Sequence, residues 1–387
     1  MNNCKAKSFA LQALLFTSEE ISPCLCREPS ERELEFMSFF LTLQSLLTVK
    51  EYHQLCRRQK KGRPGYDLLT ILALQLLQLH FKQPTMKETL LLLKENSNVR
   101  DILSLKKVPS CSTVSRLSRQ VERIVNPQLL HQRLIQLFQQ ELDDRIVGHL
   151  SIDSTIIEAR EKPVSSKKEI KNTTASSKKR GPKKKGSSEA KEYQAQQATL
   201  ERQKVKYLRE SPQKNIKKLE KRCSRTAKQN SKGKLQWFVG YKAHLATDDF
   251  GIPIAYAVTG ACVHDSQVAV PLMKMVYKST DFYYALMDKG YINPQINAYA
   301  NLIERKVIID QRQYEGVAPM AQSEKLRYKA RTTVERTNSE LKDGFLPNKL
   351  YRKKSHARYD IELSILLLTM KKIKKILLLK DQTKAIA

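Results

Sequence analysis

The sequence lacks the features that would place it in a membrane or in an oxidising compartment. No apolar run reaches the 18 residues that a membrane-spanning helix needs. The N-terminus lacks the basic, apolar and small-residue order of a signal peptide. The seven cysteines are scattered and without a paired CxxC spacing, which indicates neither a disulfide framework nor a zinc module. We therefore expect a cytoplasmic protein with no membrane partner.

Acidic residues are scarce relative to basic ones. The 387 residues include 70 Lys and Arg against 39 Asp and Glu, which leaves a net charge of +31. Such a surplus attracts polyanions, most often nucleic acid. A ribosomal or RNA-coating protein would carry the same charge, so composition indicates the partner and leaves the chemistry open. The length of 387 residues suggests two or three domains, and the hydrophobic fraction of 41% is adequate for a globular protein.

The N-terminal third of the chain has a helical pattern. A Leu-rich run over residues 66–79 predicts one helix, and Thr85 with Glu88 forms the capping box of another. We assign residues 1–60 to a helical extension and residues 61–145 to an all-α domain.

A basic helix face within this all-α domain indicates DNA binding. After a turn at residues 108–110, the next helix would place an apolar stripe on one side and arginines on another. These arginines are Arg116, Arg119 and Arg123. A helix, a turn and a basic helix are typical of proteins that read the DNA major groove, although a surface-charged helical bundle has the same pattern. We expect a domain of the helix-turn-helix type.

Residues 161–235 form a strongly basic insertion. They contain 24 Lys and Arg against 7 Asp and Glu. Segments such as Lys183-Lys184-Lys185 cannot bury a core, so the sequence predicts a largely disordered or helical insertion. Either it binds DNA phosphates electrostatically or it is a solvated linker.

The sequence on both sides of the insertion predicts a mixed sheet flanked by helices, an α+β or α/β fold preceded by the all-α domain. The expected order is βββαβαβα, with strands and helices at residues 149–157, 237–246, 253–263, 266–277, 282–287, 294–304, 307–309 and 324–343. We assign residues 146–160 and 236–350 to this domain. Residues 351–387 form a basic and apolar C-terminal helix that packs on the sheet or on a partner subunit.

Three acids occupy positions that suit catalysis. Asp153 lies within the first apolar strand, Asp288 ends the fourth, and Glu335 lies in the last long helix. Adjacent first and fourth strands would bring Asp153 and Asp288 together. Converging carboxylates favour the binding of divalent cations, and carboxylate oxygens suit Mg²⁺ or Mn²⁺. Two such ions could activate a hydroxyl and stabilise the leaving oxygen in phosphoryl transfer. The alternative is that each acid caps an element or pairs with a lysine.

The helix around Glu335 carries a polar stripe that favours the catalytic interpretation. Tyr328, Arg331, Glu335, Asn338 and Lys342 follow one another at intervals of 3, 4, 3 and 4 residues, which places them on one helix face. Such a face suits a metal flanked by phosphates, whereas a solvated charged face is the alternative.

Three further residues are weaker candidates. His264 and Asp265 could stand at the rim of the active site, or Asp265 could be a helix N-cap. Trp237, the single tryptophan, could stack on a displaced base, but a core position on an inner strand is the favoured interpretation.

Tyr328-x2-Arg331-x3-Glu335-x6-Lys342 resembles the Y-R-E-K signature of bacterial insertion-sequence DDE transposases. The segments Ile152-Asp153-Ser154-Thr155 and Met287-Asp288-Lys289-Gly290-Tyr291 resemble the two aspartate motifs of that family. Together with the helical stretch that precedes them, these matches cover most of the chain beyond residue 60.

This resemblance implies an RNase H-like catalytic domain that cleaves the ends of a mobile element and transfers the freed strand into target DNA. It implies that Tyr328, Arg331 and Lys342 contact the terminal inverted repeats near the cut. A homodimer in the synaptic complex, associated with the bacterial nucleoid, is the expected state. Only 46 residues separate Asp288 from Glu335, which leaves no room for a β-rich insertion there and leaves a hairpin intermediate in doubt. An inactive DNA-binding derivative and an RNase H-like nuclease without strand transfer remain alternatives.

Overall fold

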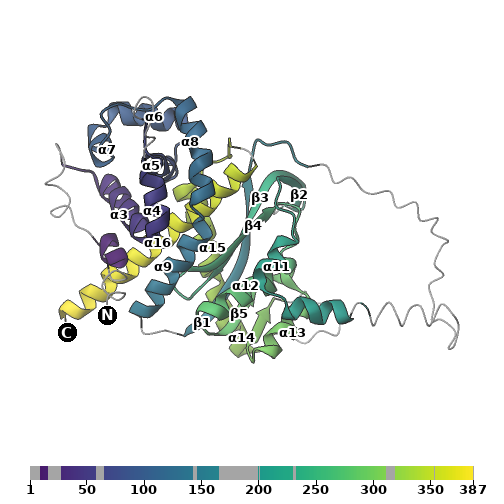
Figure 1. Ribbon diagram of the computed structural model, residues 1–387. Coiled ribbons are helices and arrows are strands. Elements are labelled where there is room, and N and C mark those ends of the chain that lie inside the picture. Colours follow the sequence, from purple (N-terminus) through teal and green to yellow (C-terminus); the bar gives the residue numbers. More distant parts are fainter. Residues whose placement is uncertain are drawn as a thin grey trace, which may run out of the picture.

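A helical half and a half built on a mixed sheet lie side by side in the structure (Figure 1). The computed structural model describes residues 9–15, 28–57, 65–142, 146–164, 199, 201–229, 232–310, 319–352 and 354–386. The predicted α+β class, with a helical region before the sheet, is confirmed.

The helical half is built from elements whose starts are fixed by local capping. Its labelled helices are α3 (Glu31–Leu46), α4 (Val49–Cys56), α5 (Leu68–His80), α6 (Met86–Glu95), α7 (Ser97–Ile102), α8 (Cys111–Ile124) and α9 (Pro127–Glu141). Each follows a Ser, Thr, Asp or Asn whose side chain accepts a hydrogen bond from an N–H of the first turn. The predicted capping box of Thr85 and Glu88 is present at the start of α6. Helix α5 is buried almost all round and forms the centre of this half.

The sheet has six strands in the order β2-β3-β1-β5-β6, with β4 also paired to β3. Its strands are β1 (Val147–Glu158), β2 (Ser224–Gln229), β3 (Leu235–Thr247), β4 (Pro253–Gly260), β5 (Phe282–Met287) and β6 (Lys306–Ile309). Pairings of β3 with β1, β2 and β4 are antiparallel, whereas β1, β5 and β6 run parallel. The predicted adjacency of the first strand and the strand at residues 282–287 is therefore confirmed.

One strand lies where the sequence predicted a disordered or helical insertion. Strand β2 falls within residues 161–235, and its ladder with β3 makes it an integral part of the sheet. The prediction is wrong there because cross-strand pairing with β3 overrides the polar local composition. Further upstream, residues 201–209 are helical and α11 (Pro212–Lys217) follows. Lys183, Lys184 and Lys185 lie outside the described residues.

Helices cover both faces of the sheet. Helix α12 (Ser266–Ser279) contacts β3 and β4, and α13 (Pro294–Leu302) contacts β6. Helix α15 (Thr332–Phe345) packs on β1 and β3. Ser151 of β1 contacts the segment just before α15, whereas Ser154 contacts the start of α12. Because side chains alternate along a strand, α12 and α15 lie on opposite faces.

The predicted helix at residues 324–343 is divided. The chain forms α14 (Gln322–Tyr328), a 3₁₀ turn η3 (Lys329–Arg331) and then α15. Helix α16 (Ser355–Ile386) crosses from the sheet to the helical half (Figure 1). It contacts α5, α9, α15 and β4, so the expectation that the C-terminal helix packs on the sheet is confirmed. Among the described residues, no helix is long and apolar enough to span a membrane.

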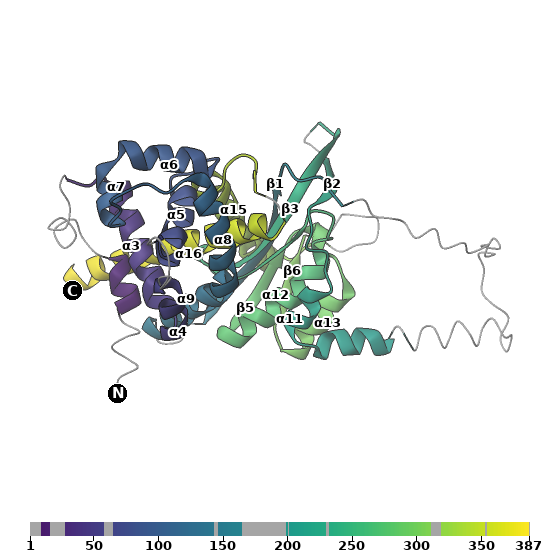
Figure 2. The ribbon, with the colours of Figure 1, turned by 45° about the horizontal axis from the view of Figure 1, so that its top comes forward.

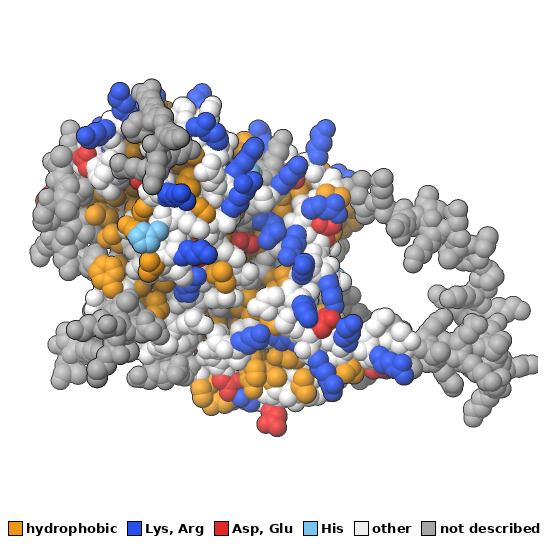
Figure 3. Space-filling model, viewed as in Figure 1, with side chains coloured by type: hydrophobic (Ala, Val, Ile, Leu, Met, Phe, Trp, Pro, Cys, Tyr) orange, Lys and Arg blue, Asp and Glu red, His pale blue; other side chains and the backbone are white. Residues whose placement is uncertain are grey.

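The outer surface displays the basic surplus of the sequence. Figure 3 shows Lys and Arg side chains spread over both halves of one face, with few acidic side chains among them. The β2–β3 ribbon extends beyond the rest of the sheet (Figure 2). A polyanion that crosses this face would meet positive charge on the helical half and on the sheet.

Candidate active site

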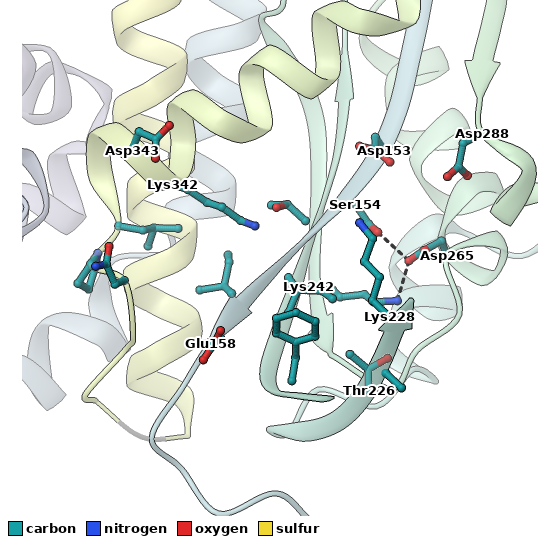
Figure 4. A pocket seen from close by; sticks show the side chains of 18 residues that line it. Asp153, Ser154, Glu158, Thr226, Lys228, Lys242, Asp265, Asp288, Lys342 and Asp343 are labelled. Atoms are coloured by element: carbon teal, nitrogen blue, oxygen red, sulfur yellow. Dashed lines mark hydrogen bonds and ion pairs between the residues drawn. The ribbon is translucent and has the colours of Figure 1, made fainter. Parts of the chain in front are cut away.

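A cavity of about 520 Å³ opens beside β1, where that strand continues past its neighbour. Strand β5 pairs with β1 only as far as Ser151, and the next backbone partner described on that side is Leu350, which bonds the end of β1 at Glu158. Side chains from β1, β2, β3, the end of β5, the start of α12, and α15 with the segment after it converge on the opening (Figure 4). Its charged lining residues are Asp153, Glu158, Lys228, Lys242, Asp265, Asp288, Lys342 and Asp343.

Asp153 is a partly buried acid of this group. Its Oδ2 accepts a hydrogen bond of 3.0 Å from the side-chain amide of Asn338 on α15. Burial raises the pKa of Asp153 to about 6, and the negative charges of Asp288 and Asp265 act in the same direction. The backbone N–H of Ser154 and the charge of Arg331 oppose this rise. The rise is therefore mainly the cost of holding a charged carboxylate in a buried position.

Asp288 reaches the same cavity from the end of β5. Its side chain accepts a hydrogen bond of 2.9 Å from the backbone N–H of Gly290 and so caps the short 3₁₀ turn η2 (Lys289–Tyr291). The parallel pairing of β1 and β5 places the carboxyl end of β5 beside Asp153. The structure thus brings two of the three predicted acids to one cavity.

Glu335 has a different partner. It lies on α15 with a half-exposed side chain, and its carboxylate forms an ion pair with the guanidinium of Arg331, one turn earlier. Opposite charges at this spacing attract, whereas Asp153 and Asp288 would repel a third carboxylate. Within the described ranges, no group of three or more acidic, His or Cys side chains is placed to hold a metal ion.

The other members of the predicted polar stripe remain neighbours across the 3₁₀ turn. Arg331 lies over the ring of Tyr328, with 5.7 Å between its guanidinium carbon and the ring centroid. Asn338 contacts Asp153, and Lys342 lines the cavity. Burial lowers the pKa of Lys342, and the nearby charge of Lys228 adds to this effect. This stripe therefore borders the acids with donors and cations.

Asp265 is a fourth acid in the cavity. It precedes α12, but its side chain does not cap that helix. Its Oδ1 instead accepts hydrogen bonds from Ser154 Oγ at 2.8 Å and Lys242 Nζ at 3.0 Å, as Figure 4 shows. Burial raises the pKa of Asp265, but the charges of His244 and Lys242 lower it below its usual value. The N-cap alternative is wrong, because these two partners hold the carboxylate.

Sequence reasoning missed Lys242 as a residue of this site. It is a lysine in an apolar strand, and its Nζ also donates to the carbonyl of Val263 at 3.0 Å. A lone cation in a buried strand was the available signal, since such a group needs a fixed acidic partner. His264, the other rim candidate, interacts with the hydroxyl of Ser266 at 2.9 Å.

Two other sets of predicted residues lie outside the cavity. Arg116, Arg119 and Arg123 are exposed on α8, where they are free to meet a polyanion. Trp237 is 60% exposed, so its favoured interpretation as a core residue is wrong. It lies on the part of β3 that pairs with β2, in the ribbon that extends beyond the rest of the sheet.

The donor chemistry of the site suits a hard divalent cation. Asp153 and Asp288 offer carboxylate oxygens, which Mg²⁺ and Mn²⁺ prefer. Burial raises the pKa of Asp153, and a bound cation would offset the cost of charging this buried carboxylate. These residues therefore fit the predicted metal.

Two family models match the chain. A family described as "Transposase DDE domain" matches residues 148–370, which is more than half of the chain and includes the whole cavity. A family described as "Transposase domain (DUF772)" matches residues 23–120, which include α3 to α7 and most of α8. A search of curated proteins gave no match, and a search of solved structures gave none either.

Proposed function

Because this chain belongs to the transposase DDE domain family, we propose that it cleaves DNA at the ends of an insertion sequence and transfers the freed strands into target DNA. Membership of the family implies DNA binding and phosphoryl transfer on nucleic acid. The observation that carries the finer proposal is the shared cavity of Asp153 and Asp288, bordered by the polar side of α15.

Asp153, Asp288 and Glu335 would together hold two divalent ions, either Mg²⁺ or Mn²⁺. Bound there, such ions supply activation of an attacking hydroxyl and stabilisation of the leaving oxygen. Glu335 would exchange Arg331 for the metal, which leaves the guanidinium able to bind a DNA phosphate. An arginine is suited to this role because its planar fork matches phosphate oxygens.

The remaining residues of the site would bind DNA or orient the carboxylate of Asp153. Asn338 fixes the carboxylate of Asp153 through its amide hydrogen bond. Lys342 lies within the cavity, where its ammonium can bind a phosphate near the reacting bond. Tyr328 would contact the terminal DNA beside Arg331. The partners in this proposal are the terminal inverted repeats and target DNA on the bacterial nucleoid, with a homodimer holding two ends together.

The test is a cleavage and joining assay on DNA that carries the element's ends, with Mg²⁺ present. We expect Asp153→Ala, Asp288→Ala and Glu335→Ala each to abolish nicking while mobility-shift assays show unchanged DNA binding. Glu340→Ala is the matched control, because Glu340 lies on the same helix and pairs with Lys372. Nicking that survives Glu335→Ala would contradict the assignment. Nicking without joining would instead support a nuclease.

A further inference from the structure

The two faces of the β2–β3 ribbon have different surroundings. Thr226 is paired with Phe238, and these two residues with Lys228 line the cavity. Since side chains alternate along each strand and paired residues share a face, Arg225, Leu235 and Trp237 lie on the opposite side. One ribbon thus forms a wall of the active site and, on its reverse, a separate surface.

That reverse surface exposes large apolar side chains. Leu235 is 66% exposed and Trp237 is 60% exposed. The guanidinium carbon of Arg225 lies 5.2 Å from the centroid of the indole, so the cation covers one side of the ring. The stretch that carries this surface, residues 221–237, contains six Lys and Arg and no Asp or Glu. Aromatic surface within dense positive charge is typical of sites that stack nucleic-acid bases and bind their phosphates.

An exposed indole favours unpaired bases over an intact duplex. In an intact duplex both sides of each base are already stacked, so an indole can stack only on an unpaired base or on a terminal pair. The ribbon projects from the body of the protein, which gives a strand room to pass over its edge (Figure 2). The opposite wall of the same ribbon lines the cavity where the proposed function places the reacting phosphate.

We propose that the β2–β3 ribbon binds the DNA strand beside the cleavage point and that Trp237 stacks on an unpaired base of it. The base covers the side of the indole that Arg225 leaves open. Lys228 on the inner face binds the backbone where the strand enters the cavity. This inference rests on the proposed function, because it assumes that the cavity acts on DNA.

The test uses the intrinsic fluorescence of the full-length protein, since Trp237 is its single tryptophan. The protein is titrated, without divalent cations, with three duplexes: one blunt, one with a short single-stranded extension, and one whose extension has abasic sites. We expect saturable quenching with the extended duplex and much weaker quenching with the blunt or abasic one. Mobility shifts on the same samples measure DNA binding independently.

Variants of Trp237 test the stacking interaction. Trp237→Ala should weaken binding of the extended duplex by about ten-fold and binding of the blunt duplex much less, because stacking on a base contributes on that scale. Trp237→Phe should restore part of the loss. Tyr283→Ala is the matched control, since Tyr283 is an exposed aromatic residue on β5.

Three outcomes would overturn the inference. These are DNA binding with unchanged indole fluorescence, equal quenching by base-containing and abasic extensions, and a concentration-dependent spectral shift without DNA, which would identify a second copy of the chain as the occupant. Any of them leaves the proposed function intact. Failure to bind all three duplexes would contradict the proposed function, and with it this inference.

Discussion

The carboxylate of Asp153 is held by neutral donors, the side-chain amide of Asn338 and the backbone N–H of Ser154. Asn338 binds it at 3.0 Å, whereas Asp265 is fixed by Lys242, and Glu335 by Arg331. Each acid of the site therefore has its own partner. These neutral donors leave the negative charge of Asp153 available to a bound cation, whereas an adjacent ammonium would itself form an ion pair with the carboxylate.

Asn338→Ala should lower the rate of nicking by about 10- to 100-fold, because a group that orients a metal-binding carboxylate contributes on that scale. DNA affinity in a mobility-shift assay should stay unchanged. Ser339→Ala serves as the control, since Ser339 bonds only the backbone of its own helix in the hydrogen bonds described for it. An unaltered nicking rate in Asn338→Ala would show that the amide does not position Asp153.

Helix α8 has one apolar, buried face and one basic, exposed face, as the proposed DNA binding requires. Its apolar side packs Val114 and Val121 into the core, while the three arginines named above point to solvent. This arrangement follows from the 3.6-residue period of the helix. Strand β2 differs from α8, because its polar sequence forms a strand through pairing with β3 and not through a local pattern.

Replacing Arg116, Arg119 and Arg123 together by Gln should weaken DNA binding and flatten its dependence on salt. Removing one phosphate interaction reduces the slope of log K against log salt by about 0.9, so removing three would reduce it by roughly 3. Binding titrations at several salt concentrations measure this slope. As control, Arg100→Gln, Lys106→Gln and Lys107→Gln remove the same charge elsewhere in the helical half. An equal change in both triple variants would assign the effect to net charge alone.

The two halves of the molecule are joined by buried polar contacts as well as by α16. Arg352 bridges Glu122 of α8 and Asp360 of α16. His131 of α9 bonds the carbonyl of Pro253 at 2.8 Å. These contacts connect the helical half to the chain around the sheet, so acid conditions that charge a buried histidine should loosen the whole assembly.

His131 predicts a pH dependence of stability. Burial lowers its pKa from 6.5 to about 4, although the bond to Pro253 acts in the opposite direction. Between these values the unfolded chain binds a proton that the folded chain does not, so the free energy of unfolding falls as the pH drops through this window. Urea unfolding of His131→Gln should show an acid-induced loss smaller than that of the wild type by up to about 3 kcal/mol.

His53→Gln is the control for this measurement, because His53 is exposed on α4. Its stability should follow the wild-type pH profile. Parallel profiles for wild type and His131→Gln would show that His131 does not couple acid to unfolding.

The sequence alone predicted the starts of several helices, including α6 and α8, most of the strand order and the positions of Asp153 and Asp288 on the sheet. These depend on local signals, namely caps, apolar periodicity and acids at strand positions. Tertiary structure decided the strand at β2, the pairing of Glu335 with Arg331, the place of Asp265 beside Lys242 and the exposure of Trp237. Each of these depends on which side chains the fold brings together or leaves uncovered, and one-dimensional periodicity does not contain that information.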